Sequence, residues 1–261
     1  MYGRKYVLFS RRHVFNKKMK LMKHQIHGPY LTGYMYQILD YFKKNVSPSR
    51  VLDIPAGLGN FAQALEQLGH TIVKVDFRKK NGFVNANMEA PLPFKDGEFD
   101  VVTCLEGIEH VINPVGLAQE LVRVTAPGGT IIISTPNITN LHSRLQFLFT
   151  GTFFQFDANS MRQTNGTPID RGHVNPFTPL HLIYIFGSQG CSLKEIRVDR
   201  AKRKVLFPLY LILKPFSYLW TRKVVKGTPQ ETYPGVKSVH SLLTRFKLMF
   251  GRSQILFFKK N

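Results

Sequence analysis

Two glycines and an acid, placed after two short apolar runs, have the spacing of a nucleoside-binding site. Residues 50–54 form an apolar run that leads into Gly57 and Gly59, and a second run, residues 71–76, ends on Asp76. Glycines let the backbone approach a ligand closely, and an acid at the end of a second strand can accept both ribose hydroxyls. We therefore expect a nucleoside-containing cofactor at one edge of a sheet.

A second group of chemically active side chains follows further along the chain. Glu106, Glu109 and His110 are spaced i, i+3 and i+4, so on a helical turn they would share one face. Two carboxylates and an imidazole could form half of the ligand shell of a divalent ion. Alternatively, Glu109 could brace the helix while His110 acts alone as a general base or hydrogen-bond donor.

The length and composition fit one large domain with a full core, because 43% of the 261 residues are hydrophobic. The two cysteines, Cys104 and Cys191, lie far apart and form neither a CxxC pair nor a zinc pattern. A reducing compartment is therefore expected, and we predict a cytoplasmic protein. The N-terminus is basic but lacks the apolar core of a signal peptide.

The net charge of +20 is concentrated at the two ends of the chain. Residues 1–24 hold eight Lys or Arg and no acid, and residues 194–261 hold sixteen Lys or Arg against three acids. The stretch between them is close to neutral. Besides serving solubility, such ends could dock on an anionic surface, either a membrane or a nucleic acid.

One apolar segment distinguishes between these two partners. Residues 205–220 are almost wholly apolar and aromatic, with Lys and Arg on both sides. As a helix they would reach about 24 Å, short of the ~30 Å hydrocarbon core, and Pro208, Lys214 and Pro215 argue further against a span. Tyr, Trp and cationic flanks favour an element that is peripheral on the inner face of the membrane, although a helix buried against the domain would also be apolar. A nucleic-acid surface would interleave basic and polar residues, which this run does not.

Hydrophobic periodicity outlines the elements that must position these groups. Short β-like runs alternate with helical patterns, which predicts a mainly parallel sheet with helices on both faces. Residues 151–171 are polar and patternless, as is typical of a functional loop or lid. Helices are predicted at 29–44, 114–124, 140–150 and 179–189, and strands at 50–54, 71–76, 83–86, 99–104, 130–135, 192–198 and 253–258.

The order of these motifs resembles that of the class I S-adenosylmethionine (SAM) methyltransferases, of the methyltransferase-11/23 type that includes the ubiquinone-pathway O-methyltransferases. The glycine turn is similar to their D-x-G-x-G-x-G motif, with Pro55 as a departure. Residues 87–102 are similar to their D-L-N-E-P-L-P-F and D-G-S-F-D-V-V runs, and residues 106–111 to E-x-x-E-H-V. A dinucleotide fingerprint needs a further glycine, so NAD is the weaker interpretation.

The resemblance implies a Rossmann-like, seven-stranded, mainly parallel sheet whose last strand is antiparallel. The chain would divide into a basic N-terminal segment at 1–27, a SAM-binding core at 28–199, a basic and apolar insertion at 200–252 and the last core strand at 253–261. The resemblance also gives the set of expected SAM contacts: Asp53, Ala56, Gly57, Gly59, Asp76, Phe77, Asn87, Met88 and Leu105.

Several of these contacts have an expected role. Asp53 would orient the glycine loop or the methionine ammonium, and Asp76 would take the ribose hydroxyls. Asn87 stands where the family has an acid that accepts from the adenine amino group, and its amide oxygen can still do so. Met88 would pack on the adenine ring.

The same resemblance adds a histidine to the acidic group. In small-RNA 3′-end 2′-O-methyltransferases, an E-x-x-E-H run holds Mg²⁺ together with a histidine from a downstream H-x-x-x-x-T segment, and residues 173–178 match that segment. Glu106, Glu109, His110 and His173 could then converge on Mg²⁺ or another divalent ion, which would lower the pKa of an attacking hydroxyl. With or without metal, we expect His110, His173 and Glu109 to be catalytic.

Three functions are compatible with these features. The leading hypothesis is a SAM-dependent methyltransferase that acts on a hydroxyl oxygen of a small or lipid-linked acceptor, of the saccharide or quinone-precursor type, at a membrane surface. The alternatives are an RNA 2′-O-methyltransferase, whose basic ends would contact phosphate, and a non-catalytic SAM-binding subunit. Neither the acceptor nor the oligomeric state follows from the sequence.

Overall fold

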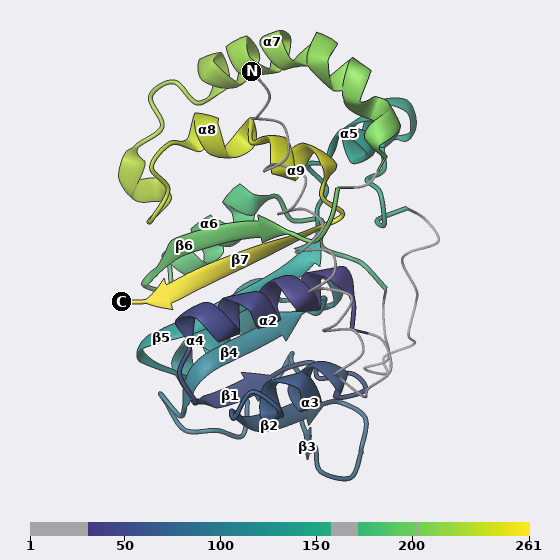
Figure 1. Cartoon of the computed structure of the whole chain (residues 1–261). Coiled ribbons are helices and arrows are strands. Elements are labelled where there is room, and N and C mark those ends of the chain that lie inside the picture. Colours follow the sequence, from purple (N-terminus) through teal and green to yellow (C-terminus); the bar gives the residue numbers. More distant parts are fainter. Residues whose placement is uncertain (1–30, 158–171, 202) are drawn as a thin grey trace, which may run out of the picture.

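One sheet runs through the described part of the chain, with its seven strands in the order β3-β2-β1-β4-β5-β7-β6 (Figure 1). The pairs among β1 to β5 are parallel, whereas β7 runs antiparallel to both β5 and β6. The predicted Rossmann-like sheet with an antiparallel last strand is confirmed. The strands are β1 (Arg50–Asp53), β2 (Thr71–Asp76), β3 (Val84–Asn85), β4 (Phe99–Leu105), β5 (Thr125–Pro136), β6 (Cys191–Val198) and β7 (Ser253–Lys260).

The computed structural model describes residues 31–157, 172–201 and 203–261. Two predictions fall largely outside these ranges. They are the basic N-terminal segment at 1–27 and the loop or lid at 151–171, of which only the first seven residues, 151–157, are described.

The strand order reverses beside β1, and this reversal locates the site. The chain builds outward from β1 through β2 to β3, then returns to the other side of β1 with β4 and continues to β5. In open α/β sheets, ligands bind outside the carboxyl ends of the strands where the order reverses. The ends of β1, β2 and β4 are therefore the expected position of a cofactor.

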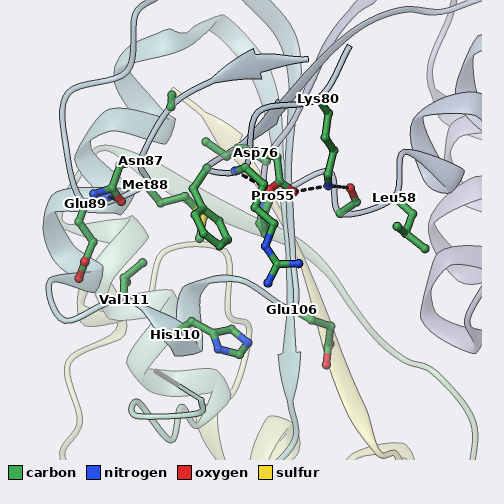
Figure 2. Close-up of a pocket in the computed structure, with 15 residues that line it drawn as sticks. Pro55, Leu58, Asp76, Lys80, Asn87, Met88, Glu89, Glu106, His110 and Val111 are labelled. Atoms are coloured by element: carbon green, nitrogen blue, oxygen red, sulfur yellow. Dashed lines mark hydrogen bonds and ion pairs between the residues drawn. The ribbon is translucent and has the colours of Figure 1, made fainter. Parts of the chain in front are cut away.

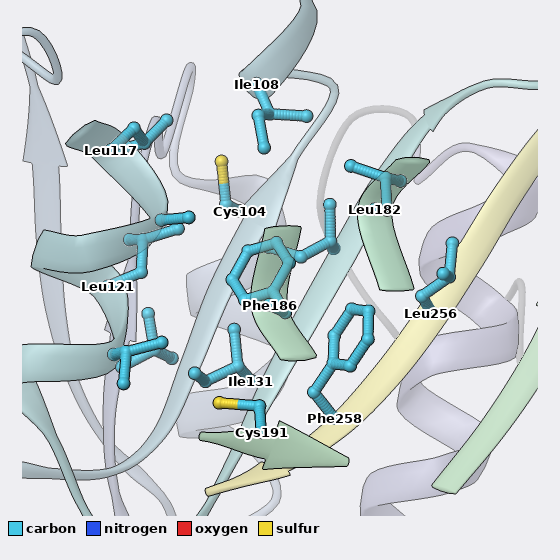
Figure 3. Close-up of a cluster of buried hydrophobic side chains, with 14 of the residues drawn as sticks. Cys104, Ile108, Leu117, Leu121, Ile131, Leu182, Phe186, Cys191, Leu256 and Phe258 are labelled. Carbon is cyan, nitrogen blue, oxygen red and sulfur yellow. The ribbon is translucent and has the colours of Figure 1, made fainter. Parts of the chain in front are cut away.

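Helices cover both faces of the sheet, as predicted (Figure 1). On one face, Phe42 of α2 and Phe61 of α3 belong to a cluster that includes side chains of β1, β4, β5 and β7. On the other face, Leu117 of α4 and Phe186 of α6 pack into the larger core cluster (Figure 3). These helices are α2 (Gly33–Asn45), α3 (Asn60–Glu66), α4 (Pro114–Val124) and α6 (Pro179–Gly187).

Because both faces are covered, the central strands are apolar along their length rather than alternating. Ile131, Ile132 and Ile133 of β5 are all fully buried, although successive side chains point to opposite faces. Cys104 and Cys191 lie in the larger cluster as free thiols (Figure 3). Burial raises the pKa of both thiols, so they are packing residues rather than nucleophiles.

Two elements begin more than two residues away from their predicted starts, and the other described boundaries differ by at most two residues. β5 begins at Thr125 rather than at residue 130, because Thr125 already pairs with Phe99 of β4 across an irregularity in the register. α2 begins at Gly33 rather than at residue 29, and Thr32 before it has an extended backbone. Residues 29 and 30 lie outside the described ranges.

The segment between β6 and β7 forms a layer of helices at one end of the molecule, at the opposite end from β3 (Figure 1). Its longest helix, α7, buries only Tyr210 among its side chains, so the alternative of a helix buried against the domain is wrong. Within the described ranges, none of the helices combines the length and apolarity needed to cross a bilayer. The elements here are η2 (Lys204–Leu206), α7 (Phe207–Val224), η3 (Gln230–Thr232), α8 (Val239–Leu243) and α9 (Phe246–Phe250), with α5 (Leu141–Thr150) beside α9.

Candidate active site

A cavity of about 350 Å³ opens at the carboxyl ends of β1, β2 and β4, where the strand order reverses (Figure 2). Asp76, the acid predicted to bind ribose, lines the cavity. Glu106 and His110, from the group of side chains that follows β4, line it too. The expected SAM contacts that line it are Gly57, Asp76, Phe77, Asn87 and Met88.

The glycine loop between β1 and α3 needs its glycines for two different reasons. Gly57 has φ +56° and Gly59 has φ +78°, a left-handed backbone that favours glycine. At Gly59 a Cβ atom would also lie 3.0 Å from the Phe83 ring. Ala56 does not line the cavity; its N–H donates to the Val75 carbonyl (2.8 Å) and so ties the loop to β2.

Asp76 ends β2 with its carboxylate beside the cavity. Its Oδ1 accepts from the backbone N–H of Arg78 at 3.0 Å, and its Oδ2 pairs with Lys80 Nζ at 3.3 Å. Lys80 Nζ also donates to the Gly57 carbonyl, so one ammonium links the acid to the glycine loop (Figure 2). A carboxylate held in place by these donors is ready to accept from two vicinal hydroxyls.

The wall that would meet an adenine ring comes from two neighbouring loops. Met88 and Phe77 both line the cavity, and the Arg78 guanidinium lies 5.2 Å from the centre of the Phe77 ring. Asn87 Oδ1 accepts from the Glu89 backbone N–H at 3.0 Å, which fixes the side chain and leaves a second lone pair on the same oxygen.

Asp53 and Leu105 do not line the cavity, and their expected role at the SAM site stays a prediction. Asp53 is 1% exposed, and its Oδ1 accepts from the Thr103 hydroxyl at 2.8 Å, so it joins β1 to β4 beneath the glycine loop. Burial raises the pKa of Asp53 to about 7, against the effect of the Thr103 hydrogen bond. Leu105 is buried at the end of β4.

Glu106 does not share a helical turn with Glu109 and His110, contrary to the prediction. The turn is a 3-10 turn, η1 (Ile108–His110), which starts after Glu106. Glu106 itself has φ +49°, and Ser134 of β5 holds both its backbone and its carboxylate: Glu106 N–H donates to Ser134 O at 2.9 Å, and Ser134 Oγ donates to Oε1 at 3.1 Å. Pairing with β5 therefore overrides the local helical spacing. Burial raises the pKa of Glu106 to about 7.

Gly107 explains how the loop accommodates Pro55. A Cβ atom on Gly107 would lie 2.5 Å from Pro55 Cδ and 3.2 Å from Cys104 Sγ. Because glycine leaves this space open, the proline ring packs directly against the chain that follows β4. The departure from the family's glycine pattern is thus compensated by a second glycine on the facing segment.

Glu109, His110 and His173 come together beside the cavity. One ligand atom of each lies within 4.8 Å of the others, and the two imidazole ring centres are 4.8 Å apart. The backbone N–H groups of Val174 and Asn175 donate to the Glu109 carbonyl at 2.9 and 3.1 Å, which brings His173 to the turn. His173 Nδ1 contacts the Gln155 carbonyl at 2.8 Å, so Nδ1 carries the proton of the neutral ring and Nε2 is its basic nitrogen.

Comparison with known proteins decides the family. Residues 23–196, more than half of the chain, match a family model described as a methyltransferase domain. The chain belongs to this methyltransferase family. The cavity at the reversal of the strand order lies where open α/β sheets bind their ligands.

Two relatives have names from quinone pathways. The methyltransferase is 37% identical over 110 residues to the demethylmenaquinone methyltransferase of Clavibacter sepedonicus, a match that covers 36% of this chain and 44% of that one. It is 33% identical over 105 residues to the ubiquinone biosynthesis O-methyltransferase of Caulobacter sp. (strain K31), covering 34% and 42%. The chain thus matches less than half the length of these curated relatives.

Solved structures of SAM-dependent methyltransferases share the fold of this methyltransferase. The one from Archaeoglobus fulgidus has a TM-score of 0.53 at 16% identity and covers 93% of this chain and 99% of its own. The one from Methanosarcina mazei has a TM-score of 0.52 at 15% identity and covers 86% and 97%. The likeness in both cases is one of fold, and it agrees with the predicted Rossmann-like sheet.

The Glu109 carboxyl is the most unusual group of the methyltransferase site. It is fully buried, and neither oxygen makes a hydrogen bond within the described residues; His110 Nε2 lies 4.0 Å from Oε1. Burial raises the pKa of Glu109 well above its ordinary value, and the nearby Glu106 carboxylate raises it further. A buried acid that resists ionisation by itself is suited to receive a cationic partner.

We expect the substitution Glu109→Gln to raise the melting temperature at mildly alkaline pH. A raised folded-state pKa means that stability is lost as the pH rises from 4.5, the ordinary value, through the folded pKa. Gln has a similar shape without the charge. We therefore expect the free energy of unfolding to rise by roughly 1–3 kcal/mol at a pH where Glu109 would be ionised in the folded wild type. The gain should vanish as the pH falls toward 4.5. Thermal melts across this pH range, in the presence of a chelator, measure the difference.

Glu98→Gln is the matched control for this substitution. The backbone N–H of Lys95 and the Arg50 side chain lower the pKa of Glu98, so its ionised form stabilises the fold. Its substitution should therefore leave the melting temperature unchanged or lower it slightly at the same pH. A Glu109→Gln protein that melts at or below the wild-type temperature throughout the range would show that Glu109 is ionised and stabilised in the fold.

Several residues that line the cavity were missed by the sequence analysis: Ile54, Leu58, Arg78, Lys80, Ala86, Glu89 and Val111. Lys80 had a local signal, because it stands four residues after Asp76 in a run of three basic residues that begins two residues after the end of β2. Leu58, which is 82% exposed at the mouth, had none, since an apolar residue between two glycines is compatible with any αβ turn.

Proposed function

We propose that this methyltransferase transfers the methyl group of SAM to a hydroxyl oxygen of a small or lipid-linked acceptor, of the saccharide or quinone-precursor type. The observation that carries the proposal is the Glu109, His110 and His173 cluster beside the cofactor cavity. The printed name of the Caulobacter relative, a ubiquinone biosynthesis O-methyltransferase, supports an oxygen acceptor.

On the cofactor side, the protein mainly has to position SAM rather than activate it. SAM supplies a methyl group that is already activated by a sulfonium, so the protein must hold it in line with the acceptor. Asp76 would accept from the ribose hydroxyls, and Phe77 and Met88 would flank the adenine. Gly57 and Lys80 keep the loop closed against Asp76, which orders the cavity before the cofactor enters.

The acceptor half needs one proton removed. As the acceptor oxygen attacks the methyl carbon, the carbon–sulfur bond breaks and the hydroxyl proton must leave. His173 would take it on Nε2, because its Nδ1 is held by the Gln155 carbonyl. The imidazolium that forms would lie close to Glu109. Its positive charge would favour the ionised form of the buried Glu109 carboxyl.

A divalent ion is a second element of the proposal. The residues fit one, because a buried carboxyl without hydrogen-bond partners lies with two imidazoles inside 4.8 Å. Glu106 does not belong to this group. With two nitrogen ligands to one oxygen ligand, the set favours Mn²⁺, Fe²⁺ or Zn²⁺ over Mg²⁺. Such an ion would supply a Lewis acid that lowers the pKa of the acceptor hydroxyl.

We also propose that the acceptor is met at the cytoplasmic face of a membrane. The exposed apolar α7 and the basic C-terminal part of the chain support this setting. RNA is the second candidate as a polyanionic partner, since basic side chains bind phosphate irrespective of sequence.

The test is methyl transfer by the full-length chain from tritiated SAM to three acceptors supplied separately: a prenylated catechol, a lipid-linked saccharide and an unstructured RNA. We expect alkali-stable label, as a methyl ether, on one of the first two. Label on RNA 2′-oxygens alone would replace the proposal with the RNA alternative. Tight binding of S-adenosylhomocysteine without transfer to any of the three would favour a non-catalytic SAM-binding subunit and overturn it.

A further inference from the structure

Helix α7 carries a stripe of large apolar side chains that faces solvent. Ile212, Phe216, Leu219, Trp220 and Val224 are each between 64% and 69% exposed. Their spacing of i, i+4, i+7, i+8 and i+12 places them along one side of the helix. Soluble proteins rarely expose contiguous apolar patches of this kind unless something binds them.

The side of α7 that contacts the rest of the domain shows which way the apolar stripe faces. Tyr210 is 5% exposed, and its ring centre lies 5.4 Å from that of Phe246 and 5.5 Å from that of Phe250 in α9. Further along, Tyr218 packs edge-on against His240 of α8, with ring centres 4.4 Å apart. The helix is therefore attached to the domain through one side, and the exposed stripe is not needed for that attachment.

The charges around the stripe are all of one sign. Residues 200–230 contain no acid, and exposed cations stand at both ends of α7: Arg203 and Lys204 before it, Arg222 and Lys223 in its last turn and Lys226 after it. Lys223 Nζ lies 5.6 Å from the centre of the Trp220 ring, so a cation and an aromatic lie together at one end. Aromatic and apolar side chains with cationic neighbours are what the interface of an anionic bilayer binds.

A second exposed apolar group lies on the helix beside α7. Helix α5 lies near one end of α7 (Figure 1), and its Leu141 and Leu145 belong to the same small cluster as Tyr210. The last turn of α5 exposes Leu148 by 73% and Phe149 by 80%. This end of the molecule therefore presents apolar side chains from two helices, α7 and α5.

We propose that the stripe on α7 docks onto the surface of an anionic bilayer, with the helix lying in the plane of the interface. Phe216, Leu219 and Trp220 would enter the boundary between headgroups and acyl chains, and Arg222 and Lys223 would contact lipid phosphates. The inference extends the proposed function, because a lipid-linked acceptor would then be brought to the enzyme. Vesicle binding needs no cofactor, so the two proposals can fail separately.

The charge pattern favours lipid over the other partners of an apolar stripe. Two copies of this chain packed through α7 would bring cations against cations, with no acid in residues 200–230 to pair with them. A nucleic acid would match the cations but not the apolar stripe between them. An anionic bilayer matches both features at once.

Trp220 provides a direct readout, because it is the single tryptophan of the chain and lies on the stripe. On adding vesicles of phosphatidylcholine mixed with phosphatidylglycerol, we expect its emission to shift to shorter wavelength and to be quenched by brominated acyl chains. Vesicles of phosphatidylcholine alone should bind more weakly, and salt should weaken binding to the mixed vesicles. Unchanged emission at saturating mixed vesicles would overturn the proposal.

Two variants separate the contributions. Phe216→Asp should weaken vesicle binding by roughly tenfold or more, since it removes a large apolar group and adds a repelled charge. Tyr184→Asp is the control, because Tyr184 is 58% exposed but lies on α6, which packs on β6. Arg222→Glu combined with Lys223→Glu should abolish the preference for phosphatidylglycerol.

Two further outcomes are decisive. Phe216→Asp should bind S-adenosylhomocysteine as the wild type does, which separates docking from the methyltransferase site. Equal vesicle binding by Phe216→Asp and Tyr184→Asp would overturn the proposal. So would a concentration-dependent dimer in which the Trp220 emission shifts without any lipid, since the stripe would then bind a second copy.

Discussion

Asp76→Ala should weaken the binding of S-adenosylhomocysteine by about a hundredfold in a calorimetric titration, because it removes two hydrogen bonds to a charged group. Asp76 is the acid that lines the cavity at the end of β2, with both oxygens directed by Arg78 and Lys80. Ribose offers two neighbouring hydroxyl donors, and no neutral side chain at this position would accept both as well. Asp76→Asn keeps one oxygen acceptor and should lie between the two.

Lys80→Ala distinguishes a lost ligand contact from a disordered loop. Lys80 links Asp76 to the Gly57 carbonyl, so removing Asp76 also frees this ammonium. If Asp76 binds the ribose, Lys80→Ala should weaken binding far less than Asp76→Ala does. Equal losses in the two variants would mean that Asp76 serves the loop, and binding by Asp76→Ala at the wild-type affinity would exclude this cavity as the nucleoside site.

The sheet was predictable because its signals are local and repeated. β2 (Thr71–Asp76) and α4 (Pro114–Val124) occupy the predicted residues, the first as a short apolar strand before an acid and the second as a helix that starts on proline after an Asn cap. The antiparallel pairing of β6 with β7, by contrast, was predicted from family resemblance. The two strands are separated by more than fifty residues, so no local pattern could indicate that they pair.

Contacts between distant strands set the positions of two acids in the site more than local spacing does. Glu106 has the i, i+3, i+4 spacing of a helical face, yet Ser134 of β5 holds it at a positive φ outside the turn. Asp53, which was expected to orient the glycine loop or the methionine ammonium, accepts from Thr103 on the neighbouring strand. Neither partner is near in sequence, so spacing alone could not reveal either contact.

The acceptor side of the site was less predictable than the cofactor side for a related reason. Glycine turns and strand-end acids recur where nucleosides bind at a sheet edge. Their presence in a sequence therefore predicts a nucleoside site in many different proteins. His173 is held at the site by contacts distant in sequence, among them the pairing of Val174 and Asn175 with the Glu109 carbonyl. Its place could be inferred from resemblance to a family motif but not from the residues around it.

His173→Ala should lower kcat by about 10²–10⁴-fold, because it removes the proposed general base. The rate is measured with the acceptor that the wild type methylates in the tritiated-SAM assay. The affinity of the variant for S-adenosylhomocysteine should stay at the wild-type value, since His173 does not line the cofactor cavity. His181→Ala is the matched control: His181 is exposed on α6 and should keep full activity. A His173→Ala enzyme as active as this control would remove His173 from the mechanism.

The same variants decide whether the cluster works as a base or as a metal site. If it acts as a base alone, a chelator should leave wild-type activity unchanged, and Mn²⁺ should give no binding heat that depends on these residues. If it holds an ion, chelation should lower wild-type kcat toward that of His173→Ala, and the heat of Mn²⁺ binding should be lost in both His173→Ala and Glu109→Gln. Glu106→Gln should then keep the ion, because the carboxylate of Glu106 is bonded to Ser134 and lies outside the three-residue group. Loss of the ion in Glu106→Gln would instead restore the four-ligand set that the sequence suggested.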